Sequence, residues 1–257
     1  MSIVEDVRRH YEANGISVPV TTPFKCKHLD DCKRCCARFT EGSEAYIGGE
    51  YEKGLVPRLL FLSLDPGSNV DDKTGKEWSV AERTIDGGRA WEEKLPLDCL
   101  PKNRHWFRTH ELAWRLLKQF IAPPPEPPPE PDIKPYFAHT QSVKCCMNKS
   151  GKREADYRLY KNCREYIPGE VAALRPDIVV TQGIRAMEAI QASFPGTAMA
   201  HPKHQDRDHM TLDLEGRQVL WILTYHPRNY GGFNRQRRDR WQAWEKAAAE
   251  FVAGRHA

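Results

Sequence analysis

The chain has 257 residues, of which 40% are hydrophobic, and a formal net charge of +4. This length can bury one substantial core, so we expect a single domain over residues 1–257. The mild basic charge permits a nucleic-acid partner without requiring one. No apolar run approaches the roughly 20 residues that span a bilayer, and the start, MSIVEDVRRHYEANG, lacks the apolar core of a signal peptide. These features argue against a membrane protein and favour a cytoplasmic one, which we expect to be a monomer.

The first half of the chain predicts two helices and a strand. The first 20 residues favour a short amphipathic helix, because apolar residues recur at helical spacing. Residues 59–64 are a continuous apolar run closed by Asp65-Pro66-Gly67, which predicts a buried strand that delivers a loop. Residues 106–121 favour a second helix.

A proline-rich run, APPPEPPPEP at residues 122–131, predicts a polyproline II loop on the surface. We interpret it as part of a surface insertion around residues 79–135. Beyond it the patterns predict strands over residues 136–144, 177–181 and 218–224, and helices over 157–174, 184–194 and 236–252. Strands that alternate with helices indicate a sheet covered on both faces, and the loops at the strands' carboxyl ends are where ligands bind in such folds.

Eight cysteines without an export signal point to metal ligation rather than disulfides. Cys32 and Cys35 form a C-x-x-C pair, and Cys145 or Cys146 with Cys163 provides a second pair far downstream. Four thiolates from two segments can hold zinc or a [4Fe-4S] cluster, and the spacing leaves both open. The alternative is that the cysteines are small buried hydrophobes, as fits Cys99.

Two loops that follow predicted strands carry chemistry-bearing residues. The Asp65 carboxylate could orient a water against a reacting carbon, although an ordinary Asp-Pro-Gly turn has the same sequence. His226, in Tyr225-His226-Pro227, is either a structural or a catalytic histidine. Taken singly, neither motif decides between these alternatives.

Together, and in this order, the motifs resemble those of the uracil-DNA glycosylase superfamily, most closely its iron–sulfur branch, family four. The resemblance covers residues 32–248. After the C-x-x-C pair, the family blocks G-E-[AG]-P-G, E-D-x-x-G-x-P-F, N-V-V-K-C, L-x-P-x-x-I-V-x-L-G and H-P correspond to residues 63–67, 71–78, 141–145, 174–183 and 226–227. The family's fold is a three-layer α/β/α arrangement with a central, mostly parallel four-stranded sheet.

The resemblance implies a [4Fe-4S] cluster rather than zinc, held by Cys32, Cys35, Cys145 and Cys163. The neighbouring thiols of Cys26, Cys36 and Cys146 are alternative ligands.

The resemblance also implies which residues act on the glycosidic bond. Cleavage leaves a cationic sugar and an anionic base, so both charges need stabilisation. Asp65 stands where family-one enzymes, with the motif G-Q-D-P-Y, carry the water-activating aspartate, and we expect it to be the general base. His226 is expected to donate a hydrogen bond to the base carbonyl.

We expect the nucleotide to leave the DNA stack and enter a pocket. Base contacts are predicted from Leu64, Trp78 and Gln141. DNA contacts are predicted from the loops and their basic neighbours: Gly67, Ser68, Lys144, Arg228, Asn229 and Tyr230.

The predicted function is a monofunctional DNA glycosylase acting on uracil or a modified pyrimidine in single- or double-stranded DNA. Gln141 replaces the asparagine of uracil-excising relatives and extends one methylene further, which keeps a modified base open. One alternative is a glycosylase against hypermodified phage cytosines in anti-phage defence. Others are a non-catalytic protein that binds modified bases or abasic sites, and a zinc-stabilised scaffold.

Overall fold

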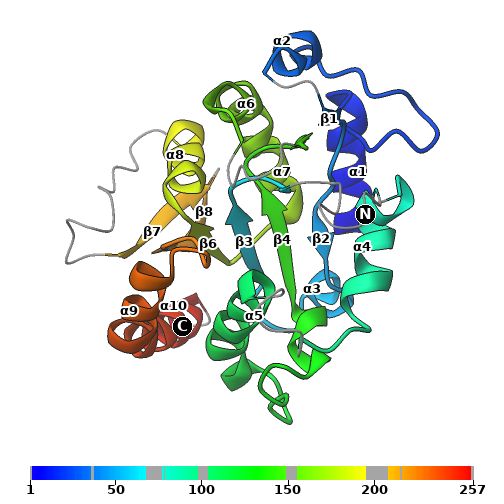
Figure 1. Cartoon of the computed structure of the whole chain (residues 1–257). Coiled ribbons are helices and arrows are strands. Elements are labelled where there is room, and N and C mark those ends of the chain that lie inside the picture. The colour runs from blue at the N-terminus through cyan, green and yellow to red at the C-terminus, as the bar shows by residue number, and fades with distance from the viewer. Residues whose placement is uncertain are drawn as a thin grey trace.

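A computed structural model describes residues 2–35, 38–67, 77, 79–97, 104–148, 155–194, 208–214 and 216–255. Its main sheet has the strand order β2-β4-β3-β6-β8-β7 (Figure 1). The four inner strands are parallel to one another: β4 (Phe137–Gln141), β3 (Leu59–Ser63), β6 (Ile178–Gln182) and β8 (Arg217–Thr224). The edge strands β2 (Tyr46–Ile47) and β7 (His209–Leu214) are antiparallel to their neighbours. The mostly parallel sheet is confirmed, and the two edge strands extend it from four strands to six.

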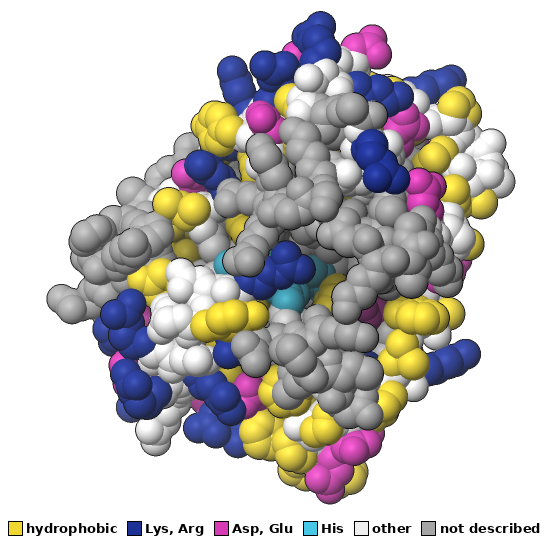
Figure 2. Space-filling view, viewed as in Figure 1, with side chains coloured by type: hydrophobic (Ala, Val, Ile, Leu, Met, Phe, Trp, Pro, Cys, Tyr) yellow, Lys and Arg dark blue, Asp and Glu magenta, His cyan; other side chains and the backbone are white. Residues whose placement is uncertain are grey.

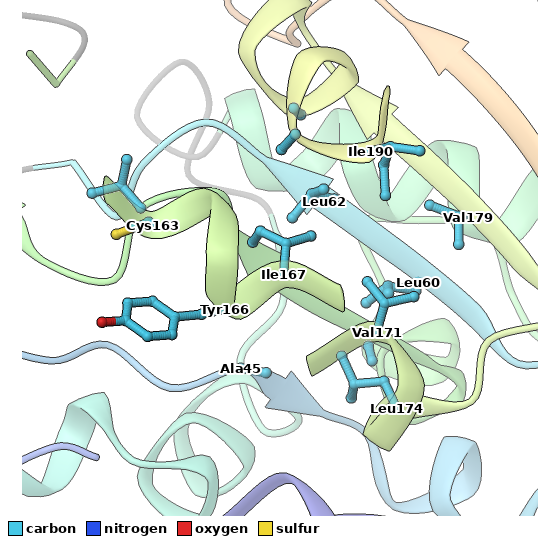
Figure 3. Close-up of a cluster of buried hydrophobic side chains, with 14 of the residues drawn as sticks. Ala45, Leu60, Leu62, Cys163, Tyr166, Ile167, Val171, Leu174, Val179 and Ile190 are labelled. Carbon is cyan, nitrogen blue, oxygen red and sulfur yellow. The ribbon is translucent and has the colours of Figure 1, made fainter. Parts of the chain in front are cut away.

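Helices cover both faces of this sheet, which confirms the three-layer α/β/α arrangement. Alternate strand residues point to opposite faces: Leu60 and Leu62 join one buried cluster, and Leu59 and Phe61 join the other. The first cluster includes residues of α1 (Ile3–Ala13), α7 (Ile167–Leu174) and α8 (Ile184–Ser193), some of which are shown in Figure 3. The second includes residues of α5 (Arg104–Leu117), α9 (Tyr230–Asp239) and α10 (Trp241–Arg255).

The predicted helices are present with shifted ends. Ser2 and Glu5 form a capping box that starts α1. The expected helix over residues 157–174 is divided into α6 (Tyr157–Cys163), the 3₁₀ turn η4 (Arg164–Tyr166) and α7, because Pro168 lacks an amide hydrogen and begins a new helix. The last predicted helix is likewise the pair α9 and α10. None of the helices in the described ranges is long and apolar enough to cross a bilayer.

Short elements complete the described structure. The strands β1 (Phe39–Thr40) and β5 (Cys146–Met147) pair as a separate two-stranded sheet. The remaining elements are α2 (Leu29–Lys33), α3 (Gly49–Lys53), α4 (Ile85–Glu92), η1 (Ala81–Arg83), η2 (Lys118–Phe120) and η3 (Pro131–Tyr136).

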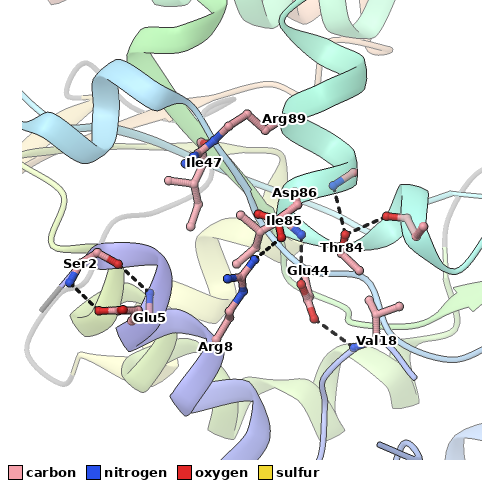
Figure 4. A network of polar contacts seen from close by, with 12 residues as sticks. Ser2, Glu5, Arg8, Val18, Glu44, Ile47, Thr84, Ile85, Asp86 and Arg89 are labelled. Carbon is pink, nitrogen blue, oxygen red and sulfur yellow. Dashed lines mark hydrogen bonds and ion pairs between the residues drawn. The ribbon is translucent and has the colours of Figure 1, made fainter. Parts of the chain in front are cut away.

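The segment expected to be a surface insertion, residues 79–135, contains helices that pack against the rest of the domain. Within it, α5 buries Leu112 and Leu116 completely against the sheet. The Glu44 carboxylate accepts a hydrogen bond from the backbone of Ile85 in α4 at 3.0 Å, and Arg89 donates to the carbonyl of Ile47 at 2.9 Å (Figure 4). The helix predicted over residues 106–121 is confirmed by α5, whose apolar face packs on the sheet.

Candidate active site

The loops that follow β3, β6 and β8 meet at the carboxyl ends of the strands. Gly183, directly after β6, has φ +100°, and a Cβ on it would lie 3.1 Å from Leu64 Cδ2 and 3.2 Å from His226 Cβ. A side chain here would be strained by the positive φ and would push both neighbours by a few tenths of an ångström, so glycine is favoured. The structure therefore brings the Leu64-Asp65 loop and the His226 loop together, as parallel strands require.

His226 is held as a neutral hydrogen-bond donor. Its Nδ1 accepts the backbone N–H of Arg228 at 3.2 Å, so its single proton is on Nε2. Its ring packs on that of His105, with 4.7 Å between centroids. Burial, and then the charge of Arg228, lowers the pKa of His226 to about 4. At neutral pH the ring can donate from Nε2 without carrying a charge.

Three donors hold the Asp65 carboxylate. Oδ1 accepts from the amide of Gly67 at 2.8 Å, and Oδ2 accepts from the amide of Ala155 at 3.1 Å and the hydroxyl of Tyr160 at 3.0 Å. Gly67 has φ +77°, which favours glycine at the end of the turn. The interactions tie the Asp65 loop to α6 and fix a negative charge at the end of β3.

Sequence analysis missed a cluster of buried histidines beside His226. His105 and His110 come from α5 and His139 from β4, with Trp106 among them: its ring centroid is 4.8 Å from that of His139 and 5.9 Å from that of His110. Burial lowers the pKa of His110 and of His139 to about 3, and that of His105 well below its usual range. Histidine side chains are visible at the centre of the face in Figure 2, beside Lys or Arg side chains. The available signal was a pair of histidines five residues apart, His110 on the helix predicted over residues 106–121 and His105 directly before it.

Gln141 lies at the end of β4 and lines a cavity of about 210 Å³. Other walls come from His139, Trp106 and Pro66, and from α4. There, burial raises the pKa of Glu92 to about 7. Of the residues from which base contacts were expected, Gln141 lines this cavity and Leu64 does not, and neither Asp65 nor His226 lines it. Two of the predicted site residues, Ser68 and Trp78, lie outside the described residues, as do Cys36 and Cys99.

The predicted DNA-contacting loop after His226 is exposed to solvent and is held in place by contacts with α5. Arg108 of α5 donates to the carbonyl of Pro227 at 2.8 Å and packs 4.6 Å from the centre of the Tyr230 ring. Asn229 caps α9 by accepting the amide of Gly232 at 3.1 Å, so its side chain also has a structural role. Arg228 and Tyr230 face solvent.

Lys144 is not where a phosphate contact requires it. Its side chain is 1% exposed, and its Nζ lies 2.5 Å from Glu170 Oε2 and 2.7 Å from Thr140 Oγ1. Releasing it toward DNA would leave Glu170 as an uncompensated buried charge, which is costly. The expected phosphate contact from Lys144 therefore does not fit the structure.

The cysteines gather around a second, separate pocket. Cys26, Cys32, Cys145 and Cys163 all line it, whereas Cys35 does not and instead donates from Sγ to the carbonyl of Asp31 at 4.0 Å. Burial, then the nearby thiols of Cys163 and Cys26, raises the pKa of Cys145, and burial raises that of Cys163 to about 12. The structure thus places Cys26 in one pocket with three of the predicted ligands, while Cys35 remains near Cys32.

Cys146, the other alternative ligand, pairs with β1 outside this pocket. Across the described ranges, no three His, Cys, Asp or Glu side chains are grouped so that they could hold a metal ion.

Comparison with known proteins agrees with the fold. The family model of the uracil DNA glycosylase superfamily matches residues 52–248, and the chain belongs to this superfamily. Membership indicates DNA glycosylase activity, the hydrolytic release of a base from DNA in base-excision repair. A search of curated proteins found no match.

Proposed function

We propose that the protein is a monofunctional DNA glycosylase that hydrolyses the N-glycosidic bond of a flipped-out pyrimidine and leaves an abasic site. The observation that carries this proposal is the neutral His226, fixed with its proton on Nε2 next to the loop that holds Asp65. A donor and a carboxylate on adjacent strand ends match the two charges that form when the bond breaks.

The two residues have different tasks in this mechanism. His226 donates from Nε2 to a carbonyl oxygen of the departing base, and stabilises the negative charge that develops there. The Asp65 carboxylate stabilises the cationic sugar and orients the attacking water. The donors from Gly67, Ala155 and Tyr160 keep that carboxylate in place during the reaction.

The test is release of a base from defined oligonucleotides, read as alkali-labile abasic sites. We expect His226→Ala to slow release by about 100- to 10,000-fold and Asp65→Asn by a similar factor. A matched control is His209→Ala, because this half-exposed histidine on the edge strand β7 lies outside the site. Wild-type rates in both site variants would contradict the mechanism. Tight binding of modified DNA without any product would favour a non-catalytic binding protein.

The cavity beside Gln141 has room for a modified pyrimidine. An apolar cavity of about 150 Å³ admits one six-membered ring. The cavity here is about 210 Å³, with further walls from α4, and leaves room for a substituent. Hypermodified phage cytosines belong to this class, and their release would make the enzyme an anti-phage factor. Uracil remains the reference substrate for comparison.

We further propose that a [4Fe-4S] cluster is bound by Cys26, Cys32, Cys145 and Cys163, which would place the chain in the iron–sulfur branch. The donor set for such a cluster would consist of the half-buried thiol of Cys26 and three buried thiols, those of Cys32, Cys145 and Cys163. The space between them is about 10 Å³, so the side chains would have to open outward to bind it. Its contribution would be to cross-link the segment before β1 to the segment around β5 and α6.

The ligand set is tested by a pair of cysteine variants. Cys26→Ser is expected to remove iron and the brown visible absorption of the purified protein, whereas Cys35→Ser is expected to keep both. The opposite result would restore Cys35 to the ligand set, and zinc without iron in the wild type would overturn the cluster.

A further inference from the structure

Buried polar side chains beneath the site form a continuous series of hydrogen bonds. It joins α5, β6, β3 and β4. Its members are Thr109, Gln182, Ser63, His139 and Gln141, and all but Gln141 are at most 2% exposed. The three internal bonds are Gln182 to Thr109 at 2.9 Å, Ser63 to Gln182, and His139 to Ser63 at 2.8 Å.

The donors and acceptors in this series can be assigned in one order only. It begins at the backbone carbonyl of His105, which accepts the Thr109 hydroxyl proton at 3.1 Å and has none to give. Thr109 must therefore accept from the amide nitrogen of Gln182. The Gln182 oxygen then accepts the proton of Ser63, whose Oγ is left to accept from His139.

The protonation of His139 in turn decides which group of the Gln141 amide faces its ring. Burial lowers the pKa of His139 to about 3, so the ring is neutral and has one proton. That proton is on Nε2, because Ser63 needs a donor there. Nδ1 is then an acceptor, and Gln141 Nε2 donates to it at 3.4 Å. Turning the amide over would place the Gln141 oxygen against a ring nitrogen that has no proton.

The other end of the amide is left open. Among the described residues, Gln141 Oε1 is buried without a hydrogen-bond partner, and Gln141 lines the 210 Å³ cavity. A buried acceptor without a partner is costly unless something supplies a donor. The amide therefore offers an acceptor, and beside it the second N–H of Nε2, in an order that the protein interior has fixed.

We propose that Ser63 and His139 are positioning residues that set the order in which Gln141 reads the edge of the base, and so decide between 4-keto and 4-amino pyrimidines. A 4-keto pyrimidine presents N3–H beside O4, and a 4-amino pyrimidine presents N3 beside an amino group, which reverses donor and acceptor. A fixed amide pairs with one order and opposes the other. This inference rests on the proposed glycosylase function.

Two buried serines offer a matched test. Ser63→Ala removes the acceptor for His139 Nε2, so the ring can take its other tautomer and the amide can turn over. Ser142→Ala is the control, since Ser142 is equally buried and donates to the Ser63 carbonyl at 2.7 Å but lies outside the series. The readout is the ratio of kcat/KM for oligonucleotides that differ only in a 4-keto or 4-amino base, with and without a matching 5-substituent.

We expect Ser63→Ala to reduce the preference of the wild type for one of the two bases by about 10- to 100-fold, the size of one oriented two-point base contact. Ser142→Ala should preserve this preference. An unchanged ratio in Ser63→Ala would overturn the proposal. If the wild type releases neither base of any pair, the proposed function fails, and the series is tested by ¹⁵N NMR of the imidazoles in the full-length protein. His139 as the neutral Nε2–H tautomer, changed by Ser63→Ala but not by Ser142→Ala, supports the inference; an Nδ1–H or charged ring at neutral pH overturns it.

Discussion

Strand β4 carries a different buried polar cluster on each face. On one face, Lys144 just beyond the strand forms an ion pair with Glu170, and Thr140 and Tyr11 donate to the same carboxylate. On the other face, His139 and Gln141 belong to a neutral series that ends in an unpartnered oxygen beside a cavity. The first cluster is charged and closed, and the second is uncharged and open. A closed cluster can contribute only to stability, whereas an open one can also bind a ligand.

The largest effect that separates the clusters is expected from Lys144→Met. It leaves Glu170 buried without a counter-charge, which should lower the free energy of unfolding by about 3–5 kcal/mol. Urea unfolding measures this loss, and base release per folded molecule should stay at the wild-type level. The control is Lys246→Met, whose exposed pair with Glu250 should contribute under about 1 kcal/mol. Lost base release with unchanged stability would instead assign Lys144 to DNA binding.

A smaller effect per residue should come from pH, through the buried histidines. Because His110, His139 and His226 have lowered pKa values in the folded state, the unfolded chain binds more protons below about pH 6.5. The contribution of these histidines to the free energy of unfolding is therefore present above that pH, and it is lost as the pH falls toward 4. Each of these histidines should cost about 2 kcal/mol between pH 7 and pH 5.

Urea unfolding at the two pH values measures this loss. His110→Phe should reduce the pH dependence by about 2 kcal/mol, because it removes one titrating group. Phenylalanine suits this position because His110 already packs against Phe137. A pH dependence in His110→Phe equal to that of the wild type would place the titrating groups elsewhere.

The smallest effect should come from Arg108→Ala at the rim of the open cluster. It removes the hydrogen bond to the Pro227 carbonyl and the packing on Tyr230, so the loop that holds His226 loosens. We expect a loss of about 2 kcal/mol in stability or less, and a fall in kcat rather than a rise in KM, since the catalytic donor is displaced. A change in KM alone would make Arg108 a binding residue.

Much of the fold followed from sequence because its signals are local. The apolar run before Asp65 and the helical spacing around Leu112 and Leu116 identified a buried strand and a helix. The prediction for Lys144 was wrong because it depended on a contact between residues that are distant in the sequence. Lys144 reads as a basic residue in a family motif, and only the placement of Glu170 shows that it is buried.

The grouping of the cysteines and the orientation of the Gln141 amide could not be predicted from spacing, for the same reason. Cys26 lies outside the C-x-x-C spacing, and only the loop before α2 brings it to Cys145 and Cys163. The hydrogen-bond series from Thr109 to Gln141 likewise joins four elements that are distant in sequence, so no spacing could reveal it. The strand-end position of Gln141 was predictable, but the orientation of its amide was not.

The central claim is that this chain releases a base from DNA, and the most direct measurement is mass spectrometry of the products after incubation with natural genomic DNAs that include heavily modified phage genomes. The account predicts a free pyrimidine and a matching number of abasic sites with wild-type protein, and neither with His226→Ala. No released base from any DNA, or equal release by His226→Ala, would contradict it.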